Sequence, residues 1–544
     1  MGTLENFITY CIQGLGMGAG MILAARRLTH YFQLESYQYH GYFQTVGRQI
    51  KRAVDPCLLL GLCYLAVFSA WALLTAPAKG ETAFHLATAA VAAGLYALAG
   101  ALIRRRGMKQ KEKKPFALTA RMKRLYGALA FLLILLPALA GFLTRWDLIV
   151  LGLYGALAAC FLPFLVALAG LIALPIEKLI FYLYFHDAEK KLLANDRLIR
   201  IGITGSYGKT STKFILAEIL SQKYNVLATP ASFNTPMGVT RIIRERLTPA
   251  HQVFIGEMGA RHVGEIKELC RLVHPTIGIL TAVGPQHLDT FKTIERIEKT
   301  KYELIDALPD DGLAVFLNDD GIVKKLYDQT EKPKLLAGDE QGDAWAEDVT
   351  VSPAGCHFTL RFRDGGSIPC DTVLLGEHNI RNILTASLVA KRLGLTNQQI
   401  ARGIGQLKPI EHRLQLLKTP NGIGVIDDAF NTNPRSSQEA LKVLSSFPGK
   451  RVIVTPGMVE LGADEDQYNE AFGQAMAEYV DVAVLVGKKH TAPIQRGLMA
   501  RGFPPENMHV VSSLEEAVAV VNGIIRPGDT VMYENDLPDH YSES

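Results

Sequence analysis

The chain has 544 residues, of which 49% are hydrophobic and 20% charged, and its formal net charge is +4 at pH 7. That length allows roughly three or four domains, each able to bury its own core, and the small net charge gives no reason to expect nucleic-acid binding. The seven cysteines are scattered and form no C-x-x-C pair, which favours buried thiols over disulfides or a zinc site.

Long apolar runs dominate the first 180 residues. Five runs are long enough for a helix to cross a bilayer, which takes roughly 20 residues, and they lack the polar face of a soluble helix. A cleavable signal peptide does not fit, because Arg26 and Arg27 follow the first run instead of preceding it. Residues 1–180 are therefore predicted to form five membrane spans, whose apolar runs start at Phe7, Cys57, Phe84, Leu125 and Leu148.

Basic residues gather in two of the loops between these runs. Five lie between the first and second runs, and ten lie from Arg104 to Arg124, between the third and fourth. Loops rich in Lys and Arg stay in the cytoplasm. The sequence thus predicts a multi-pass protein of the cytoplasmic membrane whose residues from 178 onward lie in the cytoplasm, where ATP is found. The cluster from Arg104 to Arg124 is interpreted as a topology determinant, with binding of anionic lipid headgroups as the alternative.

A phosphate-binding loop follows the membrane region. LIRIGIT (198–204) predicts a strand, and TSTKFILAEILSQ (210–222) predicts an amphipathic helix. A glycine-rich turn between them binds phosphates through backbone N–H groups, while a lysine reaches the outer phosphates and a hydroxyl meets Mg²⁺. Because position 203 is isoleucine, the spacing is the shorter G-x-x-G-K-T. The expected nucleotide-binding residues are Gly205, Ser206, Tyr207, Gly208, Lys209, Thr210 and Ser211.

Further segments extend the pattern to about residue 490. They are SFNTPMGV (232–239), VFIGEMGARHVGEI (253–266), PTIGILTAVGPQHLDTF (275–291), KTKYEL (299–304), LNDD (317–320), GEHNIRNILTA (376–386), EHRLQ (411–415), IDDAFNTNP (426–434) and GMVELG (457–462). In order and spacing the chain resembles the Mur ligase family. DDAFNTNP and GMVELG are most similar to its MurF-type branch, which adds D-alanyl-D-alanine to a muramoyl tripeptide.

This resemblance implies a fold and a reaction. After the α-helical membrane region (1–180) and a linker helix (181–197), it implies an α/β central ATP-binding domain of the P-loop type (198–408). A Rossmann-like C-terminal domain (409–544) would follow, with ATP between the two and domain closure assembling the site. ATP would phosphorylate a substrate carboxylate to an acyl phosphate, and an amine would displace the phosphate to leave an amide. The implied cofactors are ATP and Mg²⁺.

The resemblance also assigns catalytic and metal-binding roles. Lys209 is expected to hold the β- and γ-phosphates, and Thr210, Glu257 and His287 to hold Mg²⁺. Hydroxyl and carboxylate oxygens suit this ion better than zinc, and Glu257 ends an apolar strand, where carboxylates face the ligand crevice of an open α/β sheet. Lys301 is expected to be carbamylated and to help hold a second metal, which requires a lowered pKa.

Nucleotide contacts are expected from both ligase domains. Asn379 and Asn382 lie three residues apart and so share one helix face, and the family uses them for adenine. Arg413 is the expected phosphate contact from the C-terminal domain. Asp428 resembles the residue that binds the ribose hydroxyls, with the adjacent Asp427 as the competing assignment.

Two features depart from the family. The five spans stand where soluble Mur ligases have a small nucleotide-sugar-binding domain, which favours a lipid-linked carboxylate donor. The C-terminal segment VMYENDLPDHY stands where the MurF-type branch has Lys-Gly-Ser. Its residues Glu534, Asn535, Asp536 and Asp539 would make that edge acidic and suited to a cationic amine.

The expected activity is an ADP-forming amide ligase at the cytoplasmic membrane face, most similar to the addition of D-alanyl-D-alanine in peptidoglycan precursor synthesis. The expected partners are an anionic muropeptide or other carboxylate donor, an amino-acid or dipeptide amine, and the membrane, without nucleic acid. Two alternatives stay open: a membrane-bound ligase of another polymer, such as poly-γ-glutamate, and an ATP-binding scaffold without ligase activity.

Overall fold

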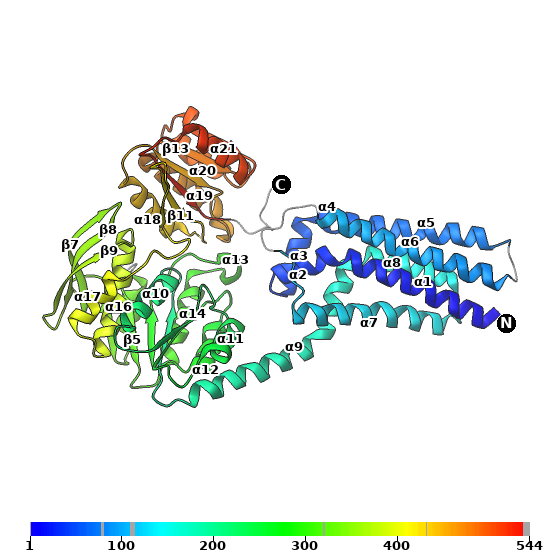
Figure 1. Cartoon of the computed structure of the whole chain (residues 1–544), viewed down its shortest axis with the longest axis horizontal. Helices are drawn as coiled ribbons and strands as arrows, with labels where there is room; N and C mark the ends of the chain where they lie inside the picture. Colours follow the sequence, from blue (N-terminus) through cyan, green and yellow to red (C-terminus); the bar gives the residue numbers. More distant parts are fainter. Residues whose placement is uncertain (1, 78–80, 109–114, 319–320, 431, 537–544) are drawn as a thin grey trace. The chain divides into compact units, whose positions relative to one another are not determined.

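The computed structural model describes residues 2–77, 81–108, 115–318, 321–430 and 432–536. The chain divides between Phe181 and Tyr182 into two compact units (Figure 1). The first is helical throughout its described part, and the second is α/β. This confirms the predicted fold class, an α-helical region followed by α/β ligase domains.

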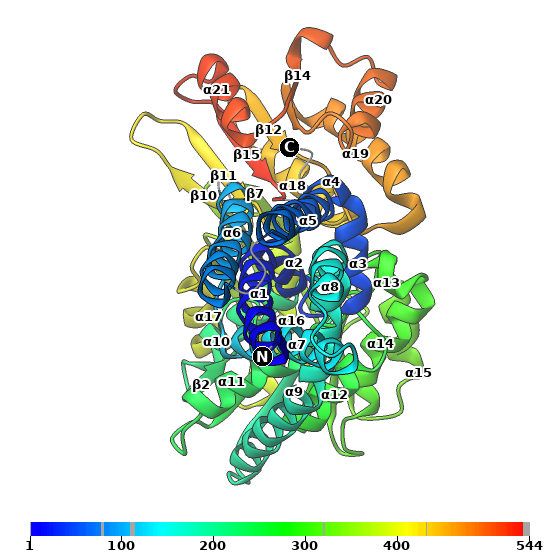
Figure 2. The ribbon, with the colours of Figure 1, turned by 90° about the vertical axis from the view of Figure 1, so that its right-hand side faces the viewer.

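The helices of the first unit run largely alongside one another, and Figure 2 views several of them end-on. Among the described residues, five helices are long and apolar enough to cross a membrane, as predicted: Leu4–Ala24, Ile50–Thr75, Thr82–Met108, Ala120–Leu143 and Leu162–Leu193. The helices of this part are α1 (Gly2–Ala24), α2 (Arg26–Leu34), α3 (Tyr39–Arg48), α4 (Ile50–Ala53), α5 (Asp55–Thr75), α6 (Thr82–Met108), α7 (Ala120–Leu143), α8 (Leu148–Cys160) and α9 (Leu162–Leu193).

The last apolar run differs from the single span predicted to start at Leu148. It is divided into α8, which has 13 residues, and α9, which has 32. The break falls at Phe161, directly before Leu162 and Pro163. Proline has no backbone N–H and its ring clashes with the preceding turn, so a helix cannot continue through this position without distortion. The segment predicted as a separate linker helix (181–197) begins as the continuation of α9.

Close backbone contact joins α1 to α6. A Cβ atom on Gly100 would overlap the backbone of Gly20, and one on Gly16 would overlap Ala93. Small residues allow helices to approach in this way where lipid removes the hydrophobic drive for association. The buried Tyr64 hydroxyl donates to the carbonyl oxygen of Met17 at 2.7 Å, so its polar end is satisfied inside the apolar bundle.

The described part of the second unit forms two sheets. The first has nine strands in the order β2-β3-β1-β4-β5-β6-β7-β8-β9, parallel from β2 to β7 and antiparallel from β7 to β9. A turn with Gly365 at φ of +93° connects β8 to β9. The strands are β1 (Ile199–Thr204), β2 (Val226–Ala228), β3 (Val253–Glu257), β4 (Ile277–Leu280), β5 (Leu313–Leu317), β6 (Lys334–Ala337), β7 (Ala344–Ser352), β8 (Gly355–Phe362) and β9 (Ser367–Thr372).

Helices cover both faces of this sheet, so successive residues of its central strands are buried on opposite sides. Val253 and Ile255 of β3 pack with α10, α16 and α17, whereas Phe254 packs with α11, α12 and α14. The helices are α10 (Lys209–Leu220), α11 (Pro236–Arg246), α12 (Glu265–Val273), α13 (Leu288–Phe291), α14 (Ile294–Asp306), α15 (Ile322–Gln329), α16 (Glu377–Arg392) and α17 (Asn397–Gly405).

The end of α9 packs on this domain. Ala188 and Leu192 are buried in the core on the α11 side. Asp187 pairs with Arg244 at 2.6 Å, and Lys191 donates to the Arg244 carbonyl oxygen at 2.7 Å. The last turns of α9 thus belong to the ligase unit in packing as well as in sequence order.

The second sheet has six strands in the order β10-β11-β15-β12-β13-β14, all parallel except β10. Its elements are β10 (Gln415–Lys418), β11 (Gly424–Asp428), α18 (Pro434–Ser445), β12 (Arg451–Thr455), η1 (Gly462–Asp464), α19 (Glu465–Tyr479), β13 (Val482–Val486), α20 (Ala492–Ala500), η2 (Pro505–Asn507), β14 (Met508–Val511), α21 (Leu514–Ile524) and β15 (Thr530–Glu534). The chain places β15 between β11 and β12, so the carboxyl ends of these three strands form the switch point where such sheets bind ligands.

Candidate functional site

The predicted phosphate-binding loop connects β1 to α10. Gly205 and Gly208 have φ values of +148° and +76°, in the region that favours glycine. The Ser206 backbone N–H donates to the Ala282 carbonyl oxygen at 2.7 Å, and its hydroxyl donates to the Gly284 carbonyl oxygen at 3.0 Å. The loop is thus held against the end of β4. Tyr207 contacts the same segment, where a Cβ on Gly284 would overlap its ring, and Ser211 is buried in the first turn of α10.

Lys209 folds back over this loop. Its Nζ donates to the carbonyl oxygens of Gly205 at 2.6 Å and Ser206 at 3.0 Å. Burial lowers the pKa of Lys209 to about 8, while the nearby Glu257 carboxylate opposes that shift. A phosphate in the loop would offer this ammonium a stronger, charged acceptor.

Glu257 is a buried carboxylate at the end of β3, and three side chains donate to it. Thr210 Oγ1 and Asn234 Nδ2 each reach Oε1 at 3.1 Å, and Lys213 Nζ reaches Oε2 at 2.9 Å. Burial alone would raise its pKa, but the charges of Lys213 and Lys209 and these hydrogen bonds lower it below the ordinary value. Glu257 is therefore ionised.

The Thr210 and Glu257 side chains fit a magnesium ion. They present a hydroxyl and an ionised carboxylate 3.1 Å apart, which are the hard oxygen donors that Mg²⁺ prefers. Across the residues that the structure describes, no group of three or more His, Cys, Asp and Glu side chains is placed to hold a metal ion.

His287 binds a residue that the sequence interpretation missed. Its Nδ1 lies 2.5 Å from Glu460 Oε2, and Glu460 Oε1 lies 3.2 Å from the Arg261 guanidinium. His287 and Glu460 both have left-handed backbones, with φ of +52° and +66°, a strain often found at functional sites. Burial lowers the pKa of His287, and Glu460 opposes that shift. With Nδ1 on a carboxylate, Nε2 is the ring nitrogen available to a metal.

Lys301 lies on α14 with only 2% of its surface exposed. Burial, and next the positive charge of Lys209, lower its pKa well below the ordinary value, while Glu265 and Glu303 oppose the shift. This direction of shift favours the neutral amine that carbamylation requires. Lys301 also lies within electrostatic range of His287.

The two predicted adenine contacts differ in their surroundings. The Thr212 hydroxyl of the loop helix donates to Asn382 Oδ1 at 3.1 Å, and a Cβ on Gly208 would lie 2.9 Å from the same oxygen. Asn379 instead donates to the Leu375 carbonyl oxygen at 2.9 Å, and its buried Oδ1 accepts no hydrogen bond from the described residues. Only Asn382 thus contacts the phosphate-binding loop and its helix.

Arg413 sits in a strained turn next to β10. Its neighbours His412 and Leu414 have φ of +58° and +45°, and its guanidinium lies 4.6 Å from the centre of the Phe430 ring. Its charge acts on Lys209 and on Lys213, so it lies near the phosphate-binding loop.

The two candidate ribose ligands have different partners. Asp427 Oδ2 lies 2.7 Å from His412 Nδ1, and Asp428 Oδ1 accepts from the Leu414 backbone N–H at 3.1 Å. Burial raises the pKa of Asp428 to about 7, and the charge of Arg413 opposes that shift. Asp428, not Asp427, is therefore the acid that shares the environment of Arg413.

Glu534 is not part of an exposed acidic edge, contrary to the sequence expectation. It pairs in register with Asp428, has no exposed surface, and accepts from the Thr455 hydroxyl at 2.5 Å. Burial raises the pKa of Glu534 to about 8, so the side chain is mostly neutral near pH 7. Asp536 is exposed, and Asp539 lies outside the described residues.

An open cleft with a volume of about 410 Å³ lies beside this loop. Its lining includes Thr210 and Glu218 of α10, Ser232, Arg413 and Phe430. This is the size range of small-molecule sites.

Three side chains of the site were absent from the predicted set: Lys213, Asn234 and Glu460. Lys213 was detectable, because it lies one helical turn after Lys209 and so on the same face. Asn234 and Glu460 lie within quoted segments, but their partners are distant in the sequence. Asp319, Asp320 and Asn431 of those segments lie outside the described residues.

Comparison with known proteins matches the second unit to two domain families. Residues 203–390 match the Mur ligase middle domain, and residues 412–533 match the Mur ligase glutamate ligase domain. The UDP-N-acetylmuramoyl-tripeptide–D-alanyl-D-alanine ligase of Bacillus subtilis is 29% identical over 338 residues, 61% of this chain and 72% of that protein. The corresponding Mycobacterium bovis ligase is 32% identical over 355 residues, 61% of this chain and 69% of that protein.

Solved structures agree with these matches. MurF from Acinetobacter baumannii has a TM-score of 0.61 at 26% identity, covering 67% of this chain and 79% of that one. MurF ligase from Thermotoga maritima, solved in complex with ADP, has a TM-score of 0.59 at 25% identity, covering 67% and 82%. The chain therefore belongs to the Mur ligase family, whose members are amide ligases that use ATP and Mg²⁺.

Proposed function

We propose that this chain is a membrane-bound ligase that joins the carboxylate of a muramoyl peptide to an amine, with D-alanyl-D-alanine addition as the closest named reaction. One observation supports this most directly: Lys209, Thr210, Glu257 and Arg413 gather around one phosphate-binding loop. The relatives that match are ligases of this name.

The reaction would proceed in two steps. A carboxylate oxygen of the donor attacks the γ-phosphorus of ATP, forming an acyl phosphate and releasing ADP. The acceptor amine then attacks the acyl carbon, and inorganic phosphate leaves as the amide forms. Lys209 must exchange its two carbonyl acceptors for phosphate oxygens, and Arg413 would reach the phosphates from the C-terminal domain.

Thr210 and Glu257 would hold the first magnesium ion, and His287 and a carbamylated Lys301 would hold the second. When bound, Mg²⁺ offsets the negative charges of the triphosphate and the donor carboxylate. Glu460 would orient the His287 ring through Nδ1. Lys213 would keep Glu257 ionised and in place before ATP arrives.

The proposed location is the cytoplasmic face of the membrane. The five long apolar helices precede the middle domain, and their basic loops follow the rule for cytoplasmic segments. The proposed division is a membrane region (1–180), a central domain (198–408) and a C-terminal domain (409–544). A carboxylate donor linked to a membrane lipid would reach a ligase held at this surface without leaving the bilayer.

One observation favours a different acceptor or polymer. The MurF-type branch has lysine in the segment where this chain has the buried Glu534, which faces Asp428 at the sheet's switch point. With the carboxyl of Glu534 in place of that lysine, the site lacks a cation that could pair with the carboxylate of the acceptor. A ligase of another polymer is therefore the second candidate.

Phosphate release by the purified, detergent-solubilised protein tests the proposal. ATP and Mg²⁺ would be supplied with UDP-muramoyl tripeptide and D-alanyl-D-alanine, and in parallel with the lipid-linked muropeptide. Lys209→Ala should abolish release. Lys299→Ala is the matched control, because this lysine is exposed on α14.

Product from the soluble pair would support the D-alanyl-D-alanine reaction with a nucleotide-linked donor. Product only from the lipid-linked donor would support recognition at the membrane. No release with either donor, alongside measurable ATP binding, would contradict the muropeptide assignment and favour another polymer or a non-catalytic scaffold.

A further inference from the structure

Asn535 directly follows β15, at the carboxyl edge of the second sheet. It belongs to the segment that stands where the MurF-type branch has Lys-Gly-Ser, and the proposed reaction gives it no role. Its backbone is left-handed, with φ of +63°, a conformation that asparagine adopts more readily than most residues. A strained residue at the switch point of an α/β sheet is a reason to ask what its side chain holds in place.

The Asn535 side chain bonds to the backbone of two loops. Its Nδ2 donates to the Gly457 carbonyl oxygen at 2.6 Å, in the loop after β12. Its Oδ1 accepts from the Thr432 backbone N–H at 3.4 Å, in the loop after β11. The backbone N–H of Asn535 also donates to the Asp428 carbonyl oxygen at 3.1 Å. One residue therefore joins the ends of β11, β12 and β15.

Gly457 is held from both sides. Its backbone N–H donates to Thr455 Oγ1 at 3.1 Å, and the Thr455 hydroxyl donates to the buried Glu534 at 2.5 Å. Its carbonyl oxygen accepts from Asn535, so both backbone groups of this glycine have side-chain partners. A larger residue does not fit here, because φ is +83° and a Cβ would lie 2.8 Å from Asn469 Oδ1.

The loop fixed in this way carries Glu460. Asn469 holds the next residue, Met458, by accepting from its N–H at 2.8 Å and donating to its carbonyl oxygen at 2.9 Å. Glu460 then turns with φ of +66° and reaches His287 Nδ1 at 2.5 Å. Because Glu460 lies only three residues after Gly457, its place on His287 depends on the path of this loop.

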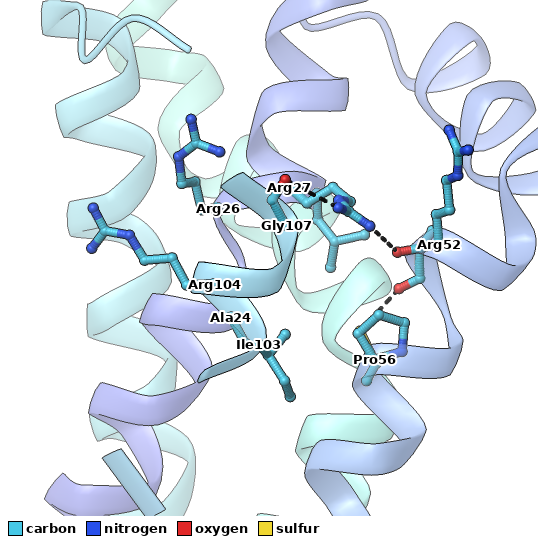
Figure 3. Close-up of a pocket in the computed structure, with 11 residues that line it drawn as sticks. Ala24, Arg26, Arg27, Arg52, Pro56, Ile103, Arg104 and Gly107 are labelled. Atoms are coloured by element: carbon cyan, nitrogen blue, oxygen red, sulfur yellow. Dashed lines mark hydrogen bonds between the residues drawn. The ribbon is translucent and has the colours of Figure 1, made fainter. Parts of the chain in front are cut away.

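A side chain also joins distant backbone segments in the helical unit. Arg27 donates to the carbonyl oxygens of Arg52 and Gly107, both at 3.2 Å (Figure 3). Those bonds fasten helices that carry none of the candidate site residues. The loops joined by Asn535, in contrast, follow a candidate ribose ligand on one side and lead to Glu460 on the other. These bonds therefore bear on the spacing of functional side chains.

We propose that Asn535 is a positioning residue of the ligase site. It bonds the loops after β11 and β12 to each other and so holds Glu460 against His287. Glu534 supports the same loop through Thr455. This inference rests on the proposed function, because it assigns Asn535 no contact with the reactants and lets it act through Glu460.

Two substitutions of Asn535 separate its bonds. N535G keeps the left-handed backbone, which glycine adopts without steric cost, and deletes the whole side chain. N535D keeps the acceptor for the Thr432 N–H but replaces the donor to Gly457 with a carboxylate oxygen. N522A is the matched control, because Asn522 is exposed on α21 of the same domain. Thermal melting in detergent shows whether each variant folds.

Hydrogen–deuterium exchange of the full-length protein without nucleotide tests the fastening itself. In N535G and N535D the backbone of residues 456–461 should exchange about tenfold faster than in the wild-type protein, since the loop opens more easily without the Gly457 bond. Exchange in N522A should match the wild type. A loop that exchanges at the wild-type rate in either N535G or N535D would overturn the proposal.

Phosphate release separates a positioning role from a purely structural one. N535G should lower kcat by about tenfold and raise the Mg²⁺ concentration needed for half-maximal rate, as expected for a misplaced Glu460. The double variant N535G/E460Q should lose no more activity than E460Q alone, because both changes act on one contact. Losses that multiply in the double variant would overturn the action through Glu460. If no donor supports release, the proposed function fails, and the exchange rates alone then support or overturn the fastening by Asn535.

Discussion

The buried carboxylate of Glu257 is kept ionised by its neighbours. Lys213 is its closest charged partner, and both side chains are almost fully buried. Breaking a buried ion pair leaves one charge uncompensated, which costs much more than the pair itself contributes. The structure around the phosphate-binding loop therefore depends on this pair, one member of which, Glu257, is also a proposed metal ligand.

Replacing Lys213 with methionine should lower the free energy of unfolding by about 3 kcal/mol, because Glu257 would stay buried without its cation. Thermal or chemical unfolding in detergent would measure this change. The double variant Lys213→Met/Glu257→Gln should recover most of the lost stability without recovering phosphate release. Equal stability of Lys213→Met and the wild-type protein would contradict a role for the ion pair in holding the site.

The buried carboxyl groups of Glu534 and Asp428 should make the free energy of unfolding depend on pH. Burial raises the pKa of Glu534 from 4.5 to about 8 and that of Asp428 from 3.8 to about 7. The hydrogen bonds of Thr455 and Thr432 to Glu534, and the charge of Arg413 near Asp428, oppose these shifts. Above each unfolded-state pKa and up to the folded value, the folded protein keeps a proton that the unfolded chain releases. The free energy of unfolding should therefore fall as pH rises through this window, by at most about 1.4 kcal/mol per pH unit for each group.

Glu534→Gln should flatten this fall, because its amide remains neutral at every pH in the window. Melting temperatures between about pH 5 and about pH 8 would measure the slope. Glu506→Gln is the control, since Glu506 is exposed in η2. A slope unchanged by Glu534→Gln would mean that the buried carboxyl is already ionised.

At the scale of elements, a hydrogen bond between side chains of the two ligase domains lies at the candidate active site. Glu460, just before η1, bonds His287, just before α13, across 173 residues of sequence. Carboxylates that orient a metal-binding histidine typically affect metal affinity or activity by about 10- to 100-fold. Glu460→Gln should reduce phosphate release by a similar factor and raise the Mg²⁺ concentration needed for half-maximal rate.

Arg261→Gln is the matched control for that variant. Arg261 contacts the other oxygen of Glu460, but its side chain is 61% exposed, and exposed ion pairs contribute little. Its loss should change the rate less than twofold. If both variants lowered the rate equally, Glu460 would be acting through the ion pair and not through His287.

Local sequence patterns predicted the elements around the nucleotide loop because each depends on neighbours in the chain. The strand at 198–204, the turn at Gly205 and the following helix are all local features, and the structure confirms them. Thr210 lies nine residues after Ile201, so its position depends on a single strand and the helix that directly follows it.

Contacts between distant segments were not predictable in the same way. Nothing in the local pattern places Glu460 on His287 or buries Glu534, since both depend on how sheets and loops meet after folding. Pro163 is a local signal for the helix break at Phe161. The long apolar run on both sides of it nevertheless led to the prediction of one continuous span. The site roles themselves remain predictions from the resemblance.

At the scale of the whole molecule, the proposed reaction requires the ligase unit to be on the side of the membrane that contains ATP. In the proposed insertion each of the five long apolar helices crosses the membrane, so each reverses the side on which the next loop emerges. The loop with Gln44, between the first two spans, should therefore be cytoplasmic, and Glu81, between the second and third, should be external.

Single-cysteine variants in a background without the seven native cysteines would test this arrangement. A membrane-impermeant maleimide applied to intact cells should label Glu81→Cys and leave Gln44→Cys unlabelled until the cells are lysed. Both positions are exposed, and neither substitution removes one of the basic residues that set the orientation. Labelling of Gln44→Cys alone in intact cells would place the ligase unit outside, where ATP is absent, and the proposed reaction would fail. Labelling of neither position before lysis would contradict an external loop between α5 and α6.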